Sequence, residues 1–306
     1  MKARVDSTRI AANDVLEIVL SPVDSAFPEY SPGSHVDFFV PGIGPRQYSL
    51  TGDGTVYSFM IQKEADGRGG SQFIHASLRP GDHIEISSPR NTFPLQQDRP
   101  LLFIAGGIGI TPFLSMIRGL DPADFRLLYF CRSDDRIVSD PNLAELLRLG
   151  VARVSIAMSP EQTLQTIDEE IRKYPDPFRV YCCGPNTLNA SVRKICEDTP
   201  WIDFRSESFK PMDADVSGPA SGFDVVLNTS GKRVHVAPQT SILEAIREAG
   251  IELPSSCESG LCGTCKVSYL SGRVDHRDLV LSEEERKTSI LVCCSRSFSE
   301  ELVLEI

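Results

Sequence analysis

Short runs in which apolar and polar residues alternate make up most of the first hundred residues. Turn signals rich in Gly, Pro and Asp separate the runs, for example Ser31-Pro32-Gly33 and Arg79-Pro80-Gly81-Asp82. Short strands at this spacing are typical of a small antiparallel barrel or sandwich. We therefore predict a first, antiparallel domain over residues 1–98, with strands at 16–20, 35–40, 55–62 and 83–86.

A continuous apolar run at 101–105 opens the second region, as expected for a strand that is buried on both faces. A helix should follow it, with Thr111 as the N-cap and Pro112 at the first helical position. Strand-like and helix-like segments then alternate to about residue 198, which is typical of a parallel α/β sheet. We predict an α/β parallel-sheet domain over residues 99–210.

A stretch rich in Gly, Pro and small residues follows at 211–222 and predicts a linker. The remaining residues, 223–306, have the length of one small domain. Ser241 and Glu244 form a capping-box pattern, which predicts a helix after two strand-like runs.

Composition and charge narrow the class of protein. Hydrophobic residues make up 41% of the 306 residues and charged residues 24%, the usual balance of a soluble globular protein. No apolar run approaches the ~18–20 residues that cross a bilayer, and the first 14 residues contain no apolar signal segment. The formal net charge of −11 argues against a nucleic-acid partner, which needs a basic face. We expect a cytoplasmic protein with no membrane partner.

Four cysteines near the C-terminus carry the strongest chemical signal. Cys257, Cys262 and Cys265 lie close together, and Cys293 follows after 27 residues, the spacing of plant-type [2Fe–2S] ligation. A structural zinc site is the alternative, but zinc sites prefer paired cysteine knuckles rather than a division into three and one. Cys294 is adjacent to Cys293, so spacing alone leaves the fourth ligand ambiguous; we choose Cys293.

Two glycine turns lie at the ends of predicted strands in the second region. The first is Ala105-Gly106-Gly107-Ile108-Gly109-Ile110-Thr111-Pro112, and the second is Cys183-Gly184-Pro185. Glycines there let the backbone approach the pyrophosphate of a dinucleotide beside a helix N-terminus. The first turn does not fit G-x-G-x-x-G cleanly, so a simple strand-to-helix turn is the alternative. Two such turns fit the ligand crevice of an open α/β sheet.

The first region carries a second phosphate-binding pattern, made of Arg46 and a predicted loop at residues 67–71. Arg46 could form a bidentate contact with a phosphate, and Gly70 with Ser71 could add backbone and hydroxyl donors. Tyr48 could lie flat against an aromatic ring system. Lys63 and Arg68 could equally be ordinary solvated charges.

Together, these motifs resemble those of the phthalate dioxygenase reductase family, the single-chain reductases of Rieske-type oxygenases. The resemblance covers essentially the whole chain in domain order. It implies an antiparallel β-barrel flavin domain, an α/β nucleotide domain and a C-terminal β-grasp ferredoxin domain. The matching segments are Arg46–Leu50, Gly67–Ser71, Ala105–Pro112, Cys183–Pro185, Cys257–Cys265, Asp275–Asp278 with Leu281-Ser282, and Cys293–Arg296.

The resemblance also implies roles for individual residues. Thr111 would lie where flavin meets nicotinamide and is the candidate catalytic residue, while Phe209 would place an aromatic ring against the flavin. The remaining FMN-binding candidates are Arg46, Gln47, Tyr48, Ser49, Lys63, Gly69, Gly70 and Ser71. The NADH-binding candidates are Gly107, Gly109, Arg132, Cys183, Gly184 and Pro185. Asp134 and Asp135 would repel a 2′-phosphate, so NADH is expected rather than NADPH.

The implied activity is electron transfer from NADH through FMN and a [2Fe–2S] cluster to a Rieske-type oxygenase. A hydride carries two electrons, whereas the cluster accepts one at a time, so a flavin between them is required chemically. Two alternatives remain: a reductase for another acceptor such as a cytochrome, or a non-catalytic zinc-stabilised interaction protein.

Overall fold

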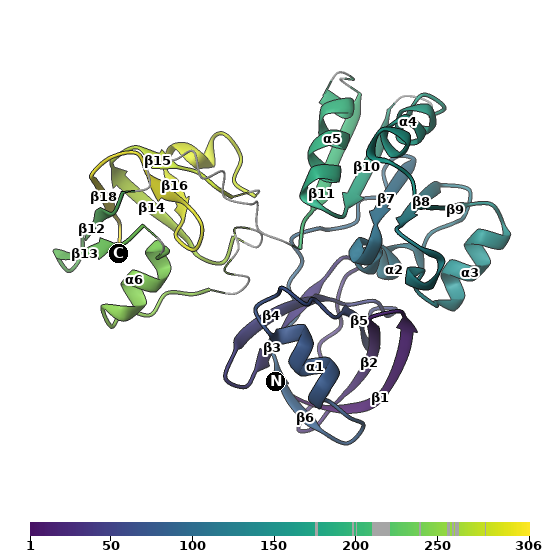
Figure 1. Cartoon of the computed structure of the whole chain (residues 1–306), viewed down its shortest axis with the longest axis horizontal. Helices are drawn as coiled ribbons and strands as arrows, with labels where there is room; N and C mark the ends of the chain where they lie inside the picture. The colour runs from purple at the N-terminus through teal and green to yellow at the C-terminus, as the bar shows by residue number, and fades with distance from the viewer. Residues whose placement is uncertain are drawn as a thin grey trace. The chain divides into compact units, whose positions relative to one another are not determined.

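A computed structural model describes the chain from Met1 to Ile306, except residues 175, 176, 198, 200, 210–220, 239, 256, 257, 259, 261, 262 and 279. The chain forms two compact units, Met1–Phe209 and Lys210–Ile306. Figure 1 shows a barrel-like sheet and an α/β sheet in the first unit and one main sheet in the second. Most of the predicted linker lies outside the described residues. No described helix has both the length and the apolar character that crossing a membrane requires.

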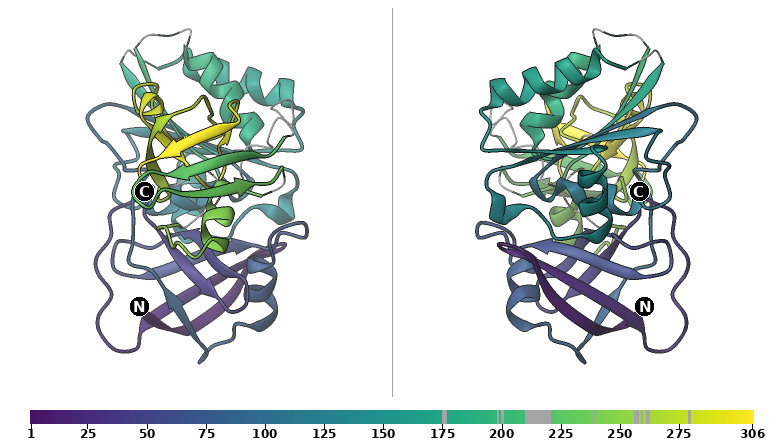
Figure 2. Two further views of the ribbon diagram at one scale, coloured as in Figure 1. Left: turned by 90° about the vertical axis from the view of Figure 1, so that its left-hand side faces the viewer. Right: turned by 90° about the vertical axis from the view of Figure 1, so that its right-hand side faces the viewer.

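Six antiparallel strands form the first sheet, in the order β4-β3-β6-β1-β2-β5. Val36 and Phe38 of β3 are buried in its core together with Ile74 of α1. Figure 2 shows α1 beside the strands of this sheet. The longest strand, β1, and helix α1 were not predicted from the sequence. The elements are β1 (Lys2–Ala12), β2 (Val15–Pro22), β3 (His35–Val40), β4 (Gly44–Ser49), β5 (Tyr57–Gln62), α1 (Gly70–Ser77) and β6 (His83–Ile86).

Five parallel strands form the second sheet, in the order β11-β10-β7-β8-β9. The predicted fold class of this region is therefore confirmed. The strands are β7 (Leu101–Gly106), β8 (Phe125–Cys131), β9 (Ala152–Ile156), β10 (Phe178–Cys183) and β11 (Ile202–Glu207). The helical elements are η1 (Gly107–Ile110), α2 (Thr111–Ile117), η2 (Asp134–Arg136), α3 (Pro141–Arg148), α4 (Pro160–Ile171) and α5 (Asn186–Glu197).

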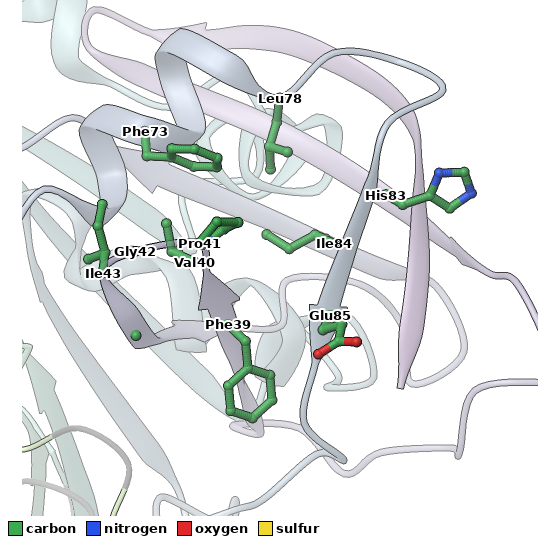
Figure 3. Close-up of a pocket in the computed structure, with 11 residues that line it drawn as sticks. Phe39, Val40, Pro41, Gly42, Ile43, Phe73, Leu78, His83, Ile84 and Glu85 are labelled. Atoms are coloured by element: carbon green, nitrogen blue, oxygen red, sulfur yellow. The ribbon is translucent and has the colours of Figure 1, made fainter.

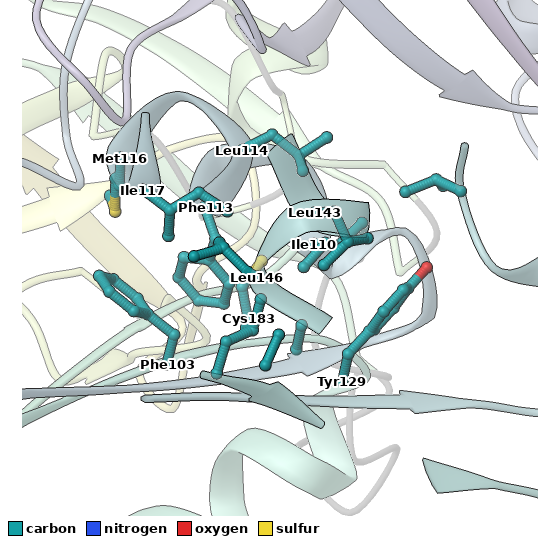
Figure 4. Packing of buried hydrophobic residues seen from close by; sticks show 14 of the residues in the cluster. Phe103, Ile110, Phe113, Leu114, Met116, Ile117, Tyr129, Leu143, Leu146 and Cys183 are labelled. Atoms are coloured by element: carbon teal, nitrogen blue, oxygen red, sulfur yellow. The ribbon is translucent and has the colours of Figure 1, made fainter. Parts of the chain in front are cut away.

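Alternate residues of the central strand β7 face opposite sides of this sheet. Leu102 and Ile104 pack with residues of α4 and α5. Phe103 and Ala105 instead pack with α2 and α3, and Figure 4 shows the side chains of α2 above Phe103. Both faces are covered, which explains the continuous apolar run at 101–105.

The barrel contributes side chains to the core beneath α2. Met60 of β5 and Phe93, after β6, are buried in the same cluster as Phe103 and Phe113. Polar contacts reinforce this joint: the Gly33 N–H donates to Ser115 Oγ at 3.1 Å. The two sheets of the first unit therefore share one hydrophobic cluster. The barrel interior and the other face of the α/β sheet have clusters of their own.

The second unit has a mixed five-stranded sheet, in the order β13-β12-β18-β14-β16, and a small ladder of β15 with β17. Helix α6 begins after Ser241, whose side chain forms the predicted capping box with Glu244. The elements are β12 (Phe223–Leu227), β13 (Lys232–Val236), α6 (Ile242–Glu248), β14 (Lys266–Ser271), β15 (Val274–Asp275), η3 (Glu285–Lys287), β16 (Ser289–Leu291), β17 (Arg296–Ser297) and β18 (Glu301–Leu304).

Two local predictions were wrong. Thr111 is the first residue of α2 rather than its N-cap, which is Ile110, because the short helix η1 occupies the preceding turn. Gly70 and Ser71 were predicted in a loop but open helix α1, with Gly69 as the N-cap in the left-handed conformation (φ 82°). Glycine adopts this conformation without steric cost.

Arg118 links the barrel to the α/β sheet, and its removal should destabilise the first unit. Its Nε donates to Thr51 O at 2.9 Å, and its Nη2 lies 2.7 Å from Oδ2 of Asp140, whose side chain is buried. Arg118→Met would leave that carboxylate unpaired, at a cost of about 3 kcal/mol in the free energy of unfolding. Urea denaturation measures the loss. Arg148→Met, which breaks an exposed pair with Glu145, should leave stability unchanged; equal effects would contradict the prediction.

Candidate functional site: two glycine turns, a phosphate loop and a cysteine centre

The two predicted glycine turns are in direct contact. Strands β7 and β10 are parallel neighbours, with Ala105 opposite Cys183, so both turns leave the sheet at the same edge. A Cβ on Gly109 would lie 2.1 Å from the carbonyl oxygen of Cys183, and one on Gly184 would lie 3.1 Å from Cα of Gly106. Side chains at these positions would push the strand ends apart. The glycines thus let the two turns pack against each other, and they also let a ligand approach the backbone.

Gly107 differs from its neighbours because space is open around it. A Cβ there would meet no atom within 4 Å, but its φ of 56° lies in the left-handed region that favours glycine. The backbone at Gly107 is therefore partly exposed between the end of β7 and the start of η1. This arrangement fits a dinucleotide that contacts the main chain.

The side chains of Thr111 and Cys183 are turned into the protein. Thr111 is 3% exposed and its hydroxyl donates to Ile108 O at 2.9 Å. Cys183 is completely buried in the core beneath α2 (Figure 4), and burial raises the pKa of its thiol well above the ordinary value. Both side chains shape the turn, while the roles predicted for them at the nicotinamide remain predictions.

Glu207, at the end of β11, is a residue of this site that the sequence reasoning missed. It pairs with Cys183 across the sheet, and burial raises the pKa of its carboxyl to about 8. Within the part of the chain that the structure describes, its Oε2 has no hydrogen-bond partner. The nearby Asn189 Nδ2 instead donates to the Glu207 carbonyl oxygen and to Ser208 Oγ. The carboxyl is therefore protonated at neutral pH.

The predicted phosphate loop lies beside β4. A Cβ on Gly70 would lie 2.4 Å from Cγ of Arg46, so the arginine stem packs directly on the start of α1. The Arg46 guanidinium donates to the carbonyl oxygens of Pro45 and Arg68 at 2.7 and 3.0 Å. These bonds hold a fixed cation next to a helix N-terminus that has no side-chain cap. That combination suits a phosphate group.

The other β4 residues divide between two faces of the strand. Tyr48 is on the Arg46 face and contacts Phe38 edge-on, with ring centroids 5.1 Å apart. Burial raises the pKa of its phenol. Gln47 and Ser49 point to the opposite face, and Ser49 is buried opposite His35. The structure thus brings Arg46, but not Gln47, to the side of Tyr48.

The remaining predicted ligands are mostly exposed. The side chains of Lys63 and Arg132 are at the surface, and Phe209 is 41% exposed at the end of the first unit. Ser71 Oγ accepts from the Glu64 N–H at 3.0 Å, a bond that does not use its hydroxyl proton. Pro185 packs against the Gly106 turn. All of these assignments remain predictions.

A groove of about 670 Å³ lies elsewhere on the barrel, and none of the predicted ligands lines it. Figure 3 shows Phe73 and Leu78 facing Ile84 across the groove, while His83 points away. The groove is lined by Phe39, Val40, Pro41, Gly42, Ile43, Gly44, Phe73, Leu78, His83, Ile84 and Glu85. Its predominantly apolar lining offers no group suited to phosphate or nicotinamide.

The second unit brings two of the predicted metal ligands together. Cys265 and Cys293 are buried and their thiols interact, although 27 residues separate them in the chain. Cys257 and Cys262 lie outside the described residues. Gly260 and Gly263, from the same loop, have φ values of 74° and 72°. Left-handed glycines let a short loop fold tightly, as a cluster-binding loop must.

Cys294 occupies a different position from Cys293. Its Sγ lies 3.7 Å from the Leu291 carbonyl oxygen, and a Cβ on Gly260 would lie 2.7 Å from this sulfur. Cys294 therefore packs against the cysteine loop from one side. Cys265 and Cys293 offer two sulfur atoms, which are soft ligands. This donor set fits an iron–sulfur cluster.

Comparisons with known proteins agree with this organisation. A family described as a 2Fe-2S iron-sulfur cluster binding domain matches residues 225–297. Phthalate dioxygenase reductase of Burkholderia cepacia is 34% identical over 322 residues, which cover 100% of this chain and 97% of the relative.

Among the solved structures that match over the whole of this chain, two are of different kinds. One is phthalate dioxygenase reductase, described as a modular structure for electron transfer from pyridine nucleotides to [2Fe–2S]; it matches with a TM-score of 0.74 and 33% identity over 98% of its own length. The other is an intact type IV self-sufficient cytochrome P450 monooxygenase, with a TM-score of 0.81 and 34% identity. This chain spans only 41% of that second protein.

A barrel that shares its core with a nucleotide-type α/β sheet, joined in one chain to a [2Fe–2S] domain, defines an oxidoreductase of the flavoprotein class. With full-length identity of 34% to its relative, the chain belongs to the phthalate dioxygenase reductase family. The predicted fold class, including the C-terminal ferredoxin domain, is confirmed.

Glu207 should make stability depend on pH. The carboxyl has a pKa of about 8 in the folded protein, well above the 4.5 of an ordinary glutamate. The native state thus retains a proton that the unfolded chain releases, and stability falls as the pH rises from about 4.5 toward 8. Glu207→Gln should remove this loss. The difference in the free energy of unfolding between pH 5 and pH 8, measured by thermal unfolding, should therefore be smaller in the variant by on the order of 1–3 kcal/mol. The exposed Glu169→Gln serves as control, and parallel curves for Glu207→Gln and the natural chain would refute the argument.

Substitution of Cys293 and Cys294, one at a time, should identify which of the two is the fourth cluster ligand. Cys293→Ser should abolish the visible and EPR signals of a [2Fe–2S] cluster, because Cys293 is the residue in contact with Cys265. Cys294→Ser should keep both signals, with at most a small change in cluster lifetime. The choice of ligand is wrong if the two variants show the reverse pattern.

Proposed function

We propose that this protein passes electrons from NADH through FMN and its [2Fe–2S] cluster to the oxygenase component of a Rieske-type system. The full-length similarity to phthalate dioxygenase reductase supports the proposal, since that relative is described as transferring electrons from pyridine nucleotides to [2Fe–2S]. Nine cysteines with no predicted disulfide framework are consistent with action in the reducing cytoplasm.

One observation carries the proposal: the chain combines two glycine turns in contact at the ends of β7 and β10 with a pair of buried cysteines in a [2Fe–2S] domain. A pyridine nucleotide donates a hydride, whereas the cluster accepts single electrons. A bound flavin supplies the conversion between the two kinds of transfer. The chain's own residues then have to bind, orient and shield these groups.

The phosphate of FMN would be held at the start of α1. The Arg46 guanidinium, fixed by Pro45 O and Arg68 O, supplies a planar cation, and the backbone of Gly70 lies beside the arginine stem. Tyr48, on the same face of β4, offers its ring to the flavin. The glycine turn at 106–109 would receive the nicotinamide nucleotide through main-chain contacts.

Preference for NADH over NADPH would come from the segment after β8. Hydrogen bonds from Ser133 and Asn13 hold the pKa of the Asp135 carboxyl below its usual range, so it is negative at neutral pH. The neighbouring Asp134 is exposed. Two carboxylates at the adenosine end would repel a 2′-phosphate.

A haem protein is a second candidate acceptor. The cytochrome P450 monooxygenase that contains a match to this whole chain, at a TM-score of 0.81, favours this alternative. The donor side of the reaction would be the same. The two candidates differ only in the protein that meets the cluster domain.

An anaerobic titration with NADH, followed by absorption, tests the donor side. Flavin and cluster bands should both bleach, with FMN and acid-labile sulfide found chemically in the same preparation. kcat/KM should be higher for NADH than for NADPH by at least about tenfold, or ~1.4 kcal/mol, and Asp134→Ser should reduce the ratio. A colourless, sulfide-free protein prepared anaerobically would overturn the proposal.

The acceptor side is tested by coupled turnover. Purified Rieske-type oxygenases should consume substrate with this reductase and NADH, faster than cytochrome c or a P450 is reduced under the same conditions. Cys293→Ser provides the control, because it should block transfer to any protein acceptor while NADH still reduces ferricyanide. Faster reduction of the haem acceptor would favour the second candidate.

A further inference from the structure

The segment Asp275-His276-Arg277-Asp278 has no role in the function proposed so far. It contains a carboxylate whose side chain is completely buried, that of Asp278. Buried aspartates are rare unless their charge is paired and hydrogen-bonded, because desolvation of a carboxylate is costly. The contacts of Asp278 must therefore offset the cost of burying its charge.

Asp278 holds the backbone that follows it. Its Oδ2 accepts hydrogen bonds from the N–H groups of Leu281 at 2.9 Å and Val280 at 3.3 Å. Arg286 approaches the same oxygen at 3.5 Å and donates to the Asp278 carbonyl oxygen at 2.9 Å. The carboxylate thus ties the backbone of Val280 and Leu281 to Arg286 of η3.

His276 completes this group of side chains. Its Nε2 lies 3.0 Å from the Arg286 carbonyl oxygen, and because a carbonyl can only accept, Nε2 carries a hydrogen. The other ring nitrogen, Nδ1, faces Asp278 Oδ1 at 3.5 Å. The imidazole therefore lies between the Arg286 carbonyl group and the Asp278 carboxylate and contacts both.

This segment lies against the cysteine loop on one side. A Cβ on Gly260 would lie 3.3 Å from Cα of Asp278 and 3.4 Å from the Arg277 carbonyl oxygen. Further along the loop, a Cβ on Gly263 would lie 3.9 Å from a methyl group of Val280. The backbone of Arg277 and Asp278 and the side chain of Val280 thus form a wall against Gly260 and Gly263.

The same segment is tied to the residues that follow Cys293. The Arg277 N–H donates to Ser295 Oγ at 3.5 Å, and Asp275 pairs with Arg296 in the β15–β17 ladder. The loop with three of the predicted ligands and the turn with the fourth therefore both contact this stretch, through Asp275, Arg277, Asp278 and Val280. Asp278 is the buried group that fixes this brace.

We propose that Asp278 is a positioning residue of the [2Fe–2S] centre: its carboxylate, with Arg286 and His276, holds Arg277, Asp278 and Val280 against Gly260 and Gly263 of the cysteine loop. The inference rests on the cluster part of the proposed function. Removal of the carboxylate frees the N–H groups of Val280 and Leu281 and leaves the Arg286 charge without its buried partner. The wall against Gly260 then loosens, and water and chelators reach the cluster more easily.

The test uses the full chain with Asp278→Ala and Asp278→Asn, beside Asp224→Asn as a matched control. Asp224 also contacts one histidine and one arginine, His235 and Arg233, but on the exposed side of β12 and β13. Three quantities are measured: loss of acid-labile sulfide in the presence of a chelator, the EPR spectrum of the reduced cluster, and thermal unfolding.

Asp278→Ala should lose its cluster about tenfold faster than the natural chain, the size expected when a group that orients a metal ligand is removed. Asp278→Asn, which keeps an acceptor for the Leu281 N–H but no charge, should be intermediate, and its EPR spectrum should shift. Asp224→Asn should match the natural chain. Reduction of ferricyanide by NADH, which does not need the cluster, should be unchanged in all variants.

Unchanged cluster lifetime and EPR spectrum in folded Asp278→Ala would overturn the inference. So would a lower melting temperature with no change in either cluster property, since that describes a purely structural residue. If Asp278→Ala does not fold, Asp278→Asn decides by the same two measurements. Absence of any cluster from the natural chain would instead overturn the cluster assignment, and the inference with it.

Discussion

The contact between the backbone of Gly109 and the carbonyl group of Cys183 constrains the rest of the first unit. It requires that β7 and β10 be neighbours, that both turns leave the sheet at one edge, and that no side chain stand between them. The buried apolar strands meet the first requirement, and glycine meets the last. Any nucleotide crevice at this edge exists because the two main chains can approach so closely.

Much of this arrangement could be predicted from the sequence, since it follows from strong local signals. The apolar run at 101–105 and the glycine turns predict the central strand and its ligand-binding edge. Strand β1 escaped prediction because only some of its side chains are buried and it contains charged residues throughout. Glu207 could not be recognised either, because an ionisable residue at a strand end shows its burial only after β10 and β11 pair.

The cysteine centre shows the same division between local and non-local information. Spacing alone indicated a cluster but left Cys293 and Cys294 open as its fourth ligand. The structure places the thiol of Cys293 against that of Cys265. The brace around Asp278 depends on contacts with Gly260, Ser295 and Arg286, which come from three separate stretches of chain. Local sequence patterns do not predict contacts between such distant stretches, which form only when the β-grasp sheet is complete.

The shared core beneath α2 has an evolutionary and practical consequence. Because Met60 and Phe93 complete the packing of Phe103 and Phe113, severing the chain between its first two sheets would expose apolar surface on both fragments. A gene fusion or a truncation at that point would therefore yield insoluble halves. The described core of the second unit is built from residues of that unit alone, so a division of the chain after Phe209 would leave this core intact.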